Sequence, residues 1–387
     1  MAHKKRAAPA ETEAVRMHVP SPCSQPTVPF PPGEYEGRFR RLTQRLRKDK
    51  LDAMFVLGES NRYYLTGFGS SAGVTVLEPG EQPSFFTDFR YLESARKQLA
   101  FLHVAKAGKW PEQFGRLAGR RRWKRVGYEG SLPAVRLKDL QAAMPQVGEW
   151  VEAEQHLREL RAIKSERELD VLRLAARMND ELLRRVLEEV HPGQTEWEIR
   201  RLLRSWVDRL GQRESFDCIV CAGANASKCH HHPSDSVLRN NMALLLDHGI
   251  TVQSYRSDMT RTVFYGKPHP LVKKIHGIVL DANQRAIRAI RAGKSCGAID
   301  AIARNVIEKA GYGKYFDHGV GHSLGIDIHE FPSFSRKAKP VLQPGMVLTV
   351  EPGIYLPGVG GVRIEDVVIV REDGCEVITA SPRTICL

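Results

Sequence analysis

The stretch HGVGHSLGIDIHE, residues 318–330, places three histidines and three glycines within thirteen positions. Imidazole nitrogens and carboxylate oxygens are common ligands of transition-metal ions. Glycine lacks a Cβ atom, so it lets the backbone come close to a bound group. The stretch therefore predicts a close-fitting loop that can present a histidine to a bound group, and the other ligands must come from elsewhere in the chain.

Two aspartates precede this stretch in runs of sequence that are typical of strands. Asp247 ends MALLLD (242–247), and Asp258 lies in the alternating run YRSDMTRTVFY (255–265). A hairpin that joins these runs would place both carboxylates on one face of a sheet. Because aspartate is also common where strands meet turns, the pair alone leaves a purely structural explanation open.

Two glutamates follow the histidine stretch within apolar runs. Glu351 lies in LTVEPG and Glu365 in VRIED, where burying an unpaired carboxylate would be costly. Such groups need cations. In a structural arrangement Arg261 and Arg363 would supply them, and the residues alone leave that alternative open.

Together with His322, these positions offer four carboxylates and one imidazole. This set suits hard or borderline divalent ions such as Mn²⁺, Co²⁺, Fe²⁺ or Zn²⁺, and it contains no thiolate. Five side chains would serve two ions only if some carboxylates bridge. Bridged ions about 3.5–4 Å apart would activate a shared water at neutral pH.

The patterns of apolar residues divide the chain into two predicted domains. Residues 34–157 alternate strand-like and helical segments, which is typical of a small α/β domain. Residues 158–387 combine helices near 271–292 and 297–310 with strand-like runs, so they predict an α+β domain with a largely antiparallel sheet. Residues 1–33 are basic and hold seven of the 22 prolines, which predicts a disordered tail.

Two helix starts are marked locally. Ser165 with Glu168, and Thr195 with Glu198, have the spacing of capping boxes ahead of apolar helical faces. We expect a helix to begin after each of them.

Composition limits the classes of function. The net charge is +13, and RRRWKR (120–125) is the most basic run. One short run without a nucleic-acid-binding motif is more typical of a solvated surface, so we expect no nucleic-acid partner. No apolar run approaches the roughly 20 residues that span a bilayer, and no signal-type apolar segment follows the basic start. We expect a cytoplasmic protein without membrane contact.

Seven cysteines, an odd number scattered along the chain, argue against a disulfide framework. Cys218 and Cys221 form a Cys-x-x-Cys pattern inside a strand-like run. Because no helix start is expected there to activate a thiol, we interpret the pair as structural.

Five motifs identify the chain by resemblance. In this order they resemble the pita-bread metallopeptidases, in particular the branch of Xaa-Pro aminopeptidase (aminopeptidase P) and Xaa-Pro dipeptidase (prolidase). SNRYYLTGF (60–68) and FTDFRYLESA (86–95) resemble the smaller creatinase-type α/β domain that precedes the catalytic domain in this branch. The resemblance covers about residues 35–387. The five motifs are LLLDHG (244–249), YRSDMTRTV (255–263), HGVGHSLGIDIHE (318–330), VLTVEPGIY (347–355) and GVRIEDVVIV (361–370).

The resemblance implies a role for each predicted ligand. Asp258 and Glu365 would bridge two ions, and Asp247 would chelate one of them. His322 and Glu351 would bind the other ion, and Glu351 would also take the proton from the bridging water. Manganese is the expected metal, with cobalt, zinc or iron as alternatives.

The resemblance also implies residues that contact the substrate. His230, the first of three consecutive histidines, and His329 would lie on opposite sides of the scissile bond and stabilise the tetrahedral charge. Arg363 would organise the site or receive a substrate carboxylate. Cys229 stands where the branch often has proline. No role is assigned to His231, His232 and His318.

The implied function is hydrolysis of the Xaa-Pro bond at the N-terminus of small peptides whose second residue is proline. We expect an Xaa-Pro aminopeptidase, with an Xaa-Pro dipeptidase as the alternative. A non-catalytic, peptide-binding pita-bread domain is the alternative of a different class, and the presence of all five ligand types argues against it. By resemblance we also expect a homodimer.

Overall fold

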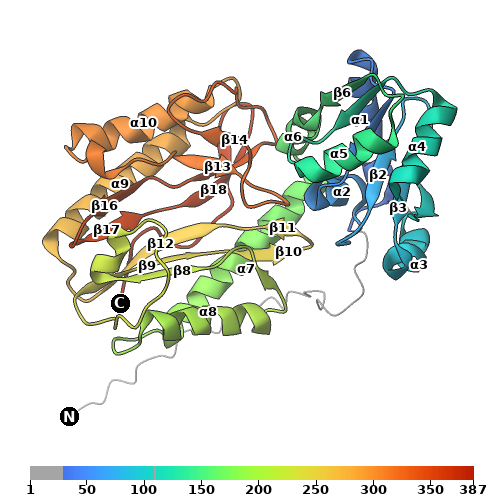
Figure 1. Ribbon diagram of the computed structural model, residues 1–387. Helices are drawn as coiled ribbons and strands as arrows, with labels where there is room; N and C mark the ends of the chain where they lie inside the picture. Colours follow the sequence, from blue (N-terminus) through green and yellow to red (C-terminus); the bar gives the residue numbers. More distant parts are fainter. Residues whose placement is uncertain (1–28, 109) are drawn as a thin grey trace, which may run out of the picture.

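Figure 1 shows two lobes, and the N-terminal one is built on a six-stranded sheet. The computed structural model describes residues 29–108 and 110–387; most of the predicted tail, residues 1–28, lies outside this part of the chain. The sheet has the order β4-β3-β2-β1-β5-β6. Its strands are β1 (Ala53–Val56), β2 (Val74–Leu77), β3 (Ser84–Thr87), β4 (His103–Lys106), β5 (Arg125–Tyr128) and β6 (Glu149–Glu152).

Helices cover the faces of this sheet. All four residues of the central strand β1 are buried, and the ring of Phe55 meets those of Phe114 and Trp123 edge to face. Helix α1 begins at Pro32, and Phe30 just before it is buried against Tyr35. The helices of this lobe are α1 (Pro32–Lys48), α2 (Glu59–Thr66), α3 (Phe89–Gln98), α4 (Trp110–Arg121) and α5 (Ala134–Ala143).

Three helices lead from this lobe into the next: α6 (Glu154–Ala162), α7 (Glu166–Glu189) and α8 (Glu196–Arg209). Both predicted capping boxes are confirmed. Ser165 caps α7 and Thr195 caps α8, each accepting a hydrogen bond from the backbone of a glutamate three residues on. In each case that glutamate accepts a hydrogen bond from the backbone N–H of the capping residue, so the start of the helix is fixed locally.

The C-terminal lobe contains two largely antiparallel sheets that face each other, with β20 parallel to its neighbour β12. The order β20-β12-β9-β8 forms one and β14-β13-β15-β18-β19 the other. The strands of the first are β8 (Ile219–Ala222), β9 (Met242–His248), β12 (Met259–Tyr265) and β20 (Ile385–Cys386). Those of the second are β13 (Gly321–Ser323), β14 (Glu330–Phe334), β15 (Val347–Val350), β18 (Asp366–Val370) and β19 (Cys375–Val377).

Two helix pairs enclose these sheets. In Figure 1, α7 and α8 lie on one side of the strands, and α9 (Pro270–Ala289) with α10 (Cys296–Lys309) lies on the other. Short strands and two 3₁₀ turns complete the lobe. They are β7 (Arg213–Glu214), β10 (Ile250–Val252), β11 (Tyr255–Arg256), β16 (Gly353–Leu356), β17 (Gly360–Arg363), η1 (Gly223–Ser227) and η2 (Gly313–Tyr315).

The structure corrects two predicted strands at functionally important positions. The run at 255–265 is divided into β11 and β12, and Asp258 lies in the break. The run at 362–370 is divided into β17 and β18, and Glu365 lies in that break. The backbone N–H of Glu365 donates to Thr260 O (3.1 Å), so the chain passes from one sheet towards the other at this point.

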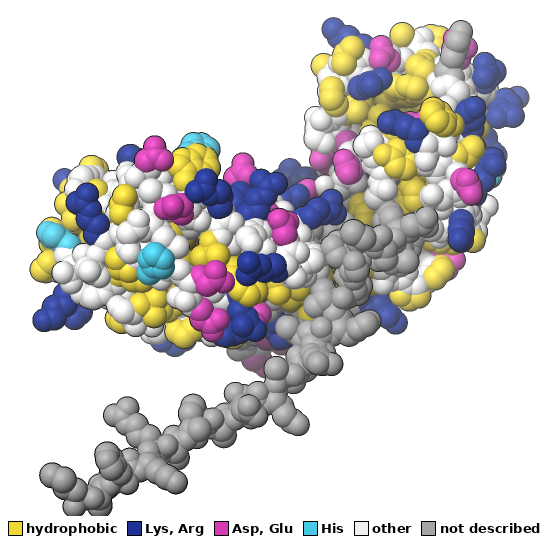
Figure 2. Space-filling model, turned by 90° about the horizontal axis from the view of Figure 1, so that it is seen from below, with side chains coloured by type: hydrophobic (Ala, Val, Ile, Leu, Met, Phe, Trp, Pro, Cys, Tyr) yellow, Lys and Arg dark blue, Asp and Glu magenta, His cyan; other side chains and the backbone are white. Residues whose placement is uncertain are grey.

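No helix in the described part of the chain is both long and apolar enough to cross a bilayer. On the face shown in Figure 2, acidic side chains are interspersed among the lysines and arginines.

Candidate metal centre

The five predicted metal ligands line a single cavity of about 790 Å³ between the two sheets of the C-terminal lobe. Strand β9 carries Asp247, and the segment just before β12 carries Asp258. From the other sheet, β13 carries His322, and the segments that follow β15 and precede β18 carry Glu351 and Glu365. Residues far apart in the chain therefore meet in one place.

The predicted hairpin brings the two aspartates together. Strands β9 and β12 pair antiparallel with Asp247 opposite Thr260. Asp258 directly precedes β12, and it lines the same cavity as Asp247. Both aspartates are buried, at 8% and 4% exposure.

Glycines allow the histidine segment to approach its neighbours closely. A Cβ atom at Gly321 would lie 2.0 Å from Thr349 O, and one at Gly319 would lie 2.4 Å from Phe334 O. Any other residue would force β13 away from β14 and β15. The glycines thus have the predicted effect of letting the backbone seat His322 against the carboxylates.

Threonines orient two of the carboxylates. Thr260 Oγ1 donates to Glu365 Oε2 at 2.7 Å. Thr349 Oγ1 accepts from the backbone N–H of His322 (3.0 Å) and lies 3.4 Å from Glu351 Oε1. Each threonine therefore ties a predicted ligand to the neighbouring strand.

The carboxylates repel one another in a buried setting. Burial, followed by the charges of Glu365 and Asp247, raises the pKa of Asp258 well above its ordinary value. Burial, followed by the charges of Glu351 and Asp247, does the same to the pKa of Glu365. Burial also raises the pKa of Glu351 to about 7. A cation between these groups would remove the repulsion.

His322 is prepared to act as a neutral ligand. Burial and the neighbouring His329 lower its pKa to about 4, so the imidazole is uncharged at neutral pH. Its Nδ1 lies 3.2 Å from Ser323 O, and its Nε2 lies 3.4 Å from Glu351 Oε1 and 3.7 Å from Asp258 Oδ2. A proton on Nδ1 leaves the Nε2 lone pair directed at the carboxylates, an arrangement common in metal-binding histidines.

The donor set fits a divalent cation. Ligand atoms of Asp258, His322 and Glu365 lie within 4.8 Å of one another. Asp247 Oδ1 is buried and has no hydrogen-bond partner among the residues that the structure describes. An unsatisfied buried carboxylate oxygen is costly, and coordination to an ion would satisfy it.

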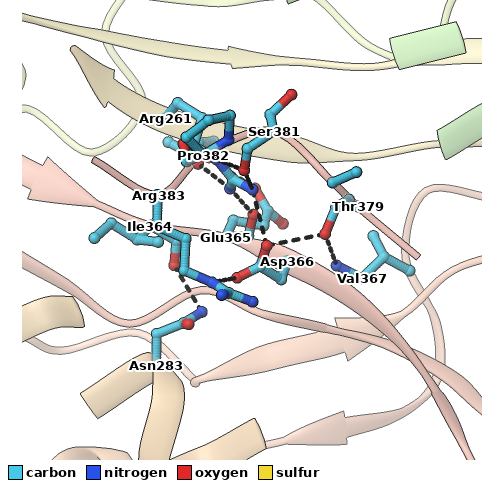
Figure 3. Close-up of polar contacts among 12 residues, drawn as sticks. Arg261, Asn283, Ile364, Glu365, Asp366, Val367, Thr379, Ser381, Pro382 and Arg383 are labelled. Atoms are coloured by element: carbon cyan, nitrogen blue, oxygen red, sulfur yellow. Dashed lines mark hydrogen bonds and ion pairs between the residues drawn. The ribbon is translucent and has the colours of Figure 1, made fainter. Parts of the chain in front are cut away.

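The arginines do not neutralise the two glutamates. Within the described chain, neither Arg261 nor Arg363 forms an ion pair with the carboxylate of Glu351 or Glu365. Arg261 instead pairs with Asp366 (2.8 Å), as Figure 3 shows. The structural alternative for the glutamates is therefore wrong.

Arg363 pairs with an aspartate. Its Nη2 donates to Asp247 Oδ2 at 2.5 Å, and its Nε donates to Thr260 Oγ1 at 3.0 Å. The guanidinium is buried, so it holds Asp247 in one orientation and adds a positive charge at the wall of the cavity.

The other predicted histidines lie at the same cavity. His230 and His329 both line it, and the ring of His329 meets that of His322 edge to face at 4.3 Å. His231 also lines the cavity, and its Nε2 contacts Glu196 Oε2 at 2.8 Å, which fixes the orientation of the ring. His232 is exposed, and His318 Nε2 contacts Tyr355 Oη at 2.9 Å.

Several polar residues of the site were not predicted. Tyr355 Oη accepts from Arg363 Nη1 (3.1 Å) and meets His318. Glu196 accepts hydrogen bonds from the backbone of Ala222 and from Ser234, and so fixes the loop that carries His230. The threonines two residues from Asp258 and Glu351 could have been found, because positions i and i+2 of a strand share a face.

Four carboxylates and one imidazole around one cavity form a set of donors that is suited to divalent cations. The chain belongs to metallopeptidase family M24, whose model matches residues 170–372. The Creatinase/Prolidase N-terminal domain matches residues 38–163. The predicted pita-bread fold with a creatinase-type N-terminal domain is thereby confirmed.

Individual relatives extend along nearly the whole chain. An Xaa-Pro dipeptidase of Pyrococcus horikoshii is 32% identical, with 90% of this chain and 98% of that protein covered. The structure of an Xaa-Pro dipeptidase from Bacillus anthracis has a TM-score of 0.87 at 34% identity, with coverage of 91% and 100%. That of an X-Pro aminopeptidase from Thermotoga maritima has a TM-score of 0.82 at 28% identity, with coverage of 89% and 100%.

Proposed function

We propose that this metallopeptidase hydrolyses the peptide bond that precedes proline at the N-terminus of small peptides. The observation that carries the proposal is the convergence of four carboxylates and one imidazole on one cavity. The names of the relatives support the choice of Xaa-Pro bonds, since both Xaa-Pro dipeptidases and an X-Pro aminopeptidase resemble the chain over most of its length.

In this proposal the five ligands hold two divalent ions, with manganese as the expected metal. When bound, such ions supply a Lewis acid and a hydroxide nucleophile at neutral pH. Glu351 accepts the proton of the attacking water, for which it must lie within hydrogen-bond reach of that water. The holding residues are Asp247, Asp258, His322, Glu351 and Glu365.

Three further residues support the reaction. His230 and His329 donate hydrogen bonds to the tetrahedral oxygen that develops during hydrolysis. Arg363 keeps Asp247 in position through the contact at 2.5 Å, and its charge favours an anionic intermediate. Proline at the second position suits a site that needs no N–H from that residue and accepts its fixed φ.

The length of the substrate distinguishes two forms of the activity. The cavity of about 790 Å³ lies towards the upper end of the range for small-molecule sites, roughly 300–1,000 Å³. This supports the predicted aminopeptidase, because a peptide longer than two residues has room. The named Xaa-Pro dipeptidases among the relatives favour the second candidate, a prolidase.

The decisive experiment compares an Xaa-Pro dipeptide with an Xaa-Pro-Yaa tripeptide, using protein treated with chelator and then supplied with Mn²⁺. We expect hydrolysis only after metal is restored, and a higher kcat/KM for the tripeptide. Preference for the dipeptide would identify the prolidase form. A peptide with alanine in place of proline serves as the control, and equal cleavage of it would refute the specificity.

Two wider expectations remain predictions. A homodimer would be seen by light scattering. The metal would be identified by mass spectrometry of protein purified without chelator, and failure of any divalent ion to bind or activate would favour a non-catalytic binding protein.

A further inference from the structure

A short loop separates the two histidines that face each other in the site. Residues 324–329 join β13 to β14, so the loop begins just after His322 and includes His329. The two rings are 4.3 Å apart. The conformation of this loop therefore sets the position of His329 relative to the predicted metal ligand.

The loop is closed on itself by a buried glutamate. Glu330, whose side chain is 5% exposed, accepts from the backbone N–H of Asp327 at 3.1 Å. Lys164 Nζ donates to Glu330 Oε2 at 3.2 Å and to Ser323 Oγ at 3.2 Å. One lysine thus bridges the residue after His322 and the residue after His329.

A single arginine connects this loop to the N-terminal lobe. Arg161, at the end of α6, donates from Nη2 to Asp327 Oδ2 at 2.6 Å and also to Glu330. Its Nη1 donates to Asn61 Oδ1 at 2.8 Å. Its side chain is 9% exposed, so these contacts are made largely out of water, where hydrogen bonds between charged groups are strong.

The N-terminal side of this connection is itself held firmly. Asn61 Nδ2 donates to Glu129 Oε1 at 2.7 Å, and Glu129 also accepts from the backbone N–H of Gly58 at 2.7 Å. Helix α2 also contacts the loop directly, because Ser60 Oγ donates to Asp327 Oδ1 at 2.5 Å. Helix α2 therefore reaches the loop of His329 in two ways.

We infer that Arg161 is a positioning residue through which the N-terminal lobe fixes the loop of His329 for catalysis. The inference rests on the proposed function, in which His329 touches the substrate. The planar guanidinium meets Asn61, Asp327 and Glu330 simultaneously, whereas the single ammonium of a lysine cannot match this fork. On this account the N-terminal lobe is part of the catalytic apparatus.

The test replaces the guanidinium of Arg161 with an ammonium group, which keeps the positive charge but loses the forked arrangement of donors. We expect Arg161→Lys to lower kcat for an Xaa-Pro-Yaa peptide by about 10- to 100-fold, since small displacements of catalytic groups have effects of this size. KM should change much less and bound metal should be unchanged. Hydrogen–deuterium exchange should become faster in residues 324–329 and stay the same in β15 and β18.

Controls separate positioning from general stability. Arg45→Lys alters another ion pair to helix α6, with Glu159, and should leave kcat unchanged. In a His329→Ala background, Arg161→Lys should lower kcat by less than about twofold, because coupled residues have non-additive effects. Should Arg161→Lys fail to fold, Ser60→Ala provides a milder test, with a fall in kcat of about threefold to tenfold.

Two results would overturn the inference. One is an unchanged kcat and unchanged exchange of the loop in both variants; the other is an equal fall in kcat with or without His329. If the unaltered protein does not cleave Xaa-Pro peptides, the proposed function fails instead. The exchange measurement then still decides whether Arg161 holds the loop.

Discussion

Glu365 and Asp366 are neighbours in the chain and both are buried, yet they lie in opposite electrostatic surroundings. Asp366 accepts from Arg261 (2.8 Å), Arg383 (2.6 Å) and Thr379 (2.9 Å), as Figure 3 shows. Against the effect of burial, the two arginines hold the pKa of Asp366 below its ordinary value. Glu365, facing the cavity, has carboxylates as neighbours and a raised pKa.

This contrast separates a carboxylate that stabilises the fold from one that serves the site. A buried ion pair with several hydrogen bonds satisfies Asp366 within the protein itself. The carboxylates of Asp258 and Glu365 form no ion pair with an arginine among the described residues, and although the charge of Arg363 lowers their pKa values, burial and the neighbouring carboxylates raise them more. A bound cation would favour their charged forms. Asp247 is intermediate, because one of its oxygens accepts from Arg363 and the other has no hydrogen-bond partner within the described part of the chain.

The largest effect should follow from changing a cavity carboxylate. We expect Asp258→Asn to lower kcat/KM about a thousandfold or more, because an ion contributes several kcal/mol of transition-state stabilisation and each 1.36 kcal/mol is about tenfold. Bound metal, measured by mass spectrometry, should fall with it. Asp281→Asn, which alters an exposed pair with Arg285 on α9, is the matched control. Full activity in Asp258→Asn would show that this aspartate is not a ligand.

The next largest effect should follow from changing Asp366, the carboxylate that is paired with arginines. We expect Asp366→Asn to lower the free energy of unfolding by about 3–5 kcal/mol, because it leaves the fully buried Arg261 without its counter-charge. Urea denaturation of the metal-free protein at pH 7.5 measures this change.

The adjacent residue provides the control for that measurement. Glu365→Gln has the same change in charge one position earlier, but it removes a repulsive carboxylate. The metal-free Glu365→Gln protein should be at least as stable as the unaltered one. Equal destabilisation by the two substitutions would mean that the surroundings of Glu365 and Asp366 do not differ as described.

Sequence alone predicted the features that depend on local or repeated patterns. The capping boxes at Ser165 and Thr195 are fixed within one helical turn, and the β9–β12 hairpin follows from alternation. Strands β4 and β6 are harder to predict, because they are the edge strands of their sheet and have exposed ends and only partly buried centres. Edge strands give a weak apolar signal.

The remaining features depend on contacts between distant segments. The break in the strand at Glu365 is set by a hydrogen bond to Thr260, and the choice of Asp366 over Glu365 as the partner of Arg261 depends on the same crossing. A one-residue shift along a strand exchanges its two faces. Neither fact is encoded in the neighbouring residues, so both required the structure.

The smallest expected effect is a dependence of stability on pH. A carboxylate in the cavity and a carboxylate paired with cations should contribute to it with opposite signs. Glu351, with its pKa raised to about 7, contributes stability below its ordinary pKa of 4.5 that is lost as pH rises through 7. Glu330 behaves in the reverse sense: although burial alone would raise its pKa, Lys164 and Arg161 lower it to about 2. Its contribution is present above pH 4.5 and is lost as pH falls through 2.

Metal-free protein should therefore be most stable near pH 5, with slopes of at most about 1.4 kcal/mol per pH unit for each proton. Urea midpoints between pH 3 and pH 8 measure this curve. Adding Mn²⁺ should remove the loss above pH 5, because bound carboxylates no longer repel, and leave the loss in acid unchanged. Glu351→Gln should reduce the upper slope without metal, while Asp258 and Glu365, whose pKa values are also raised, keep the remainder of it. Stability of the metal-free protein that rises from pH 5 to pH 7.5 would contradict the unpaired state of the cavity carboxylates.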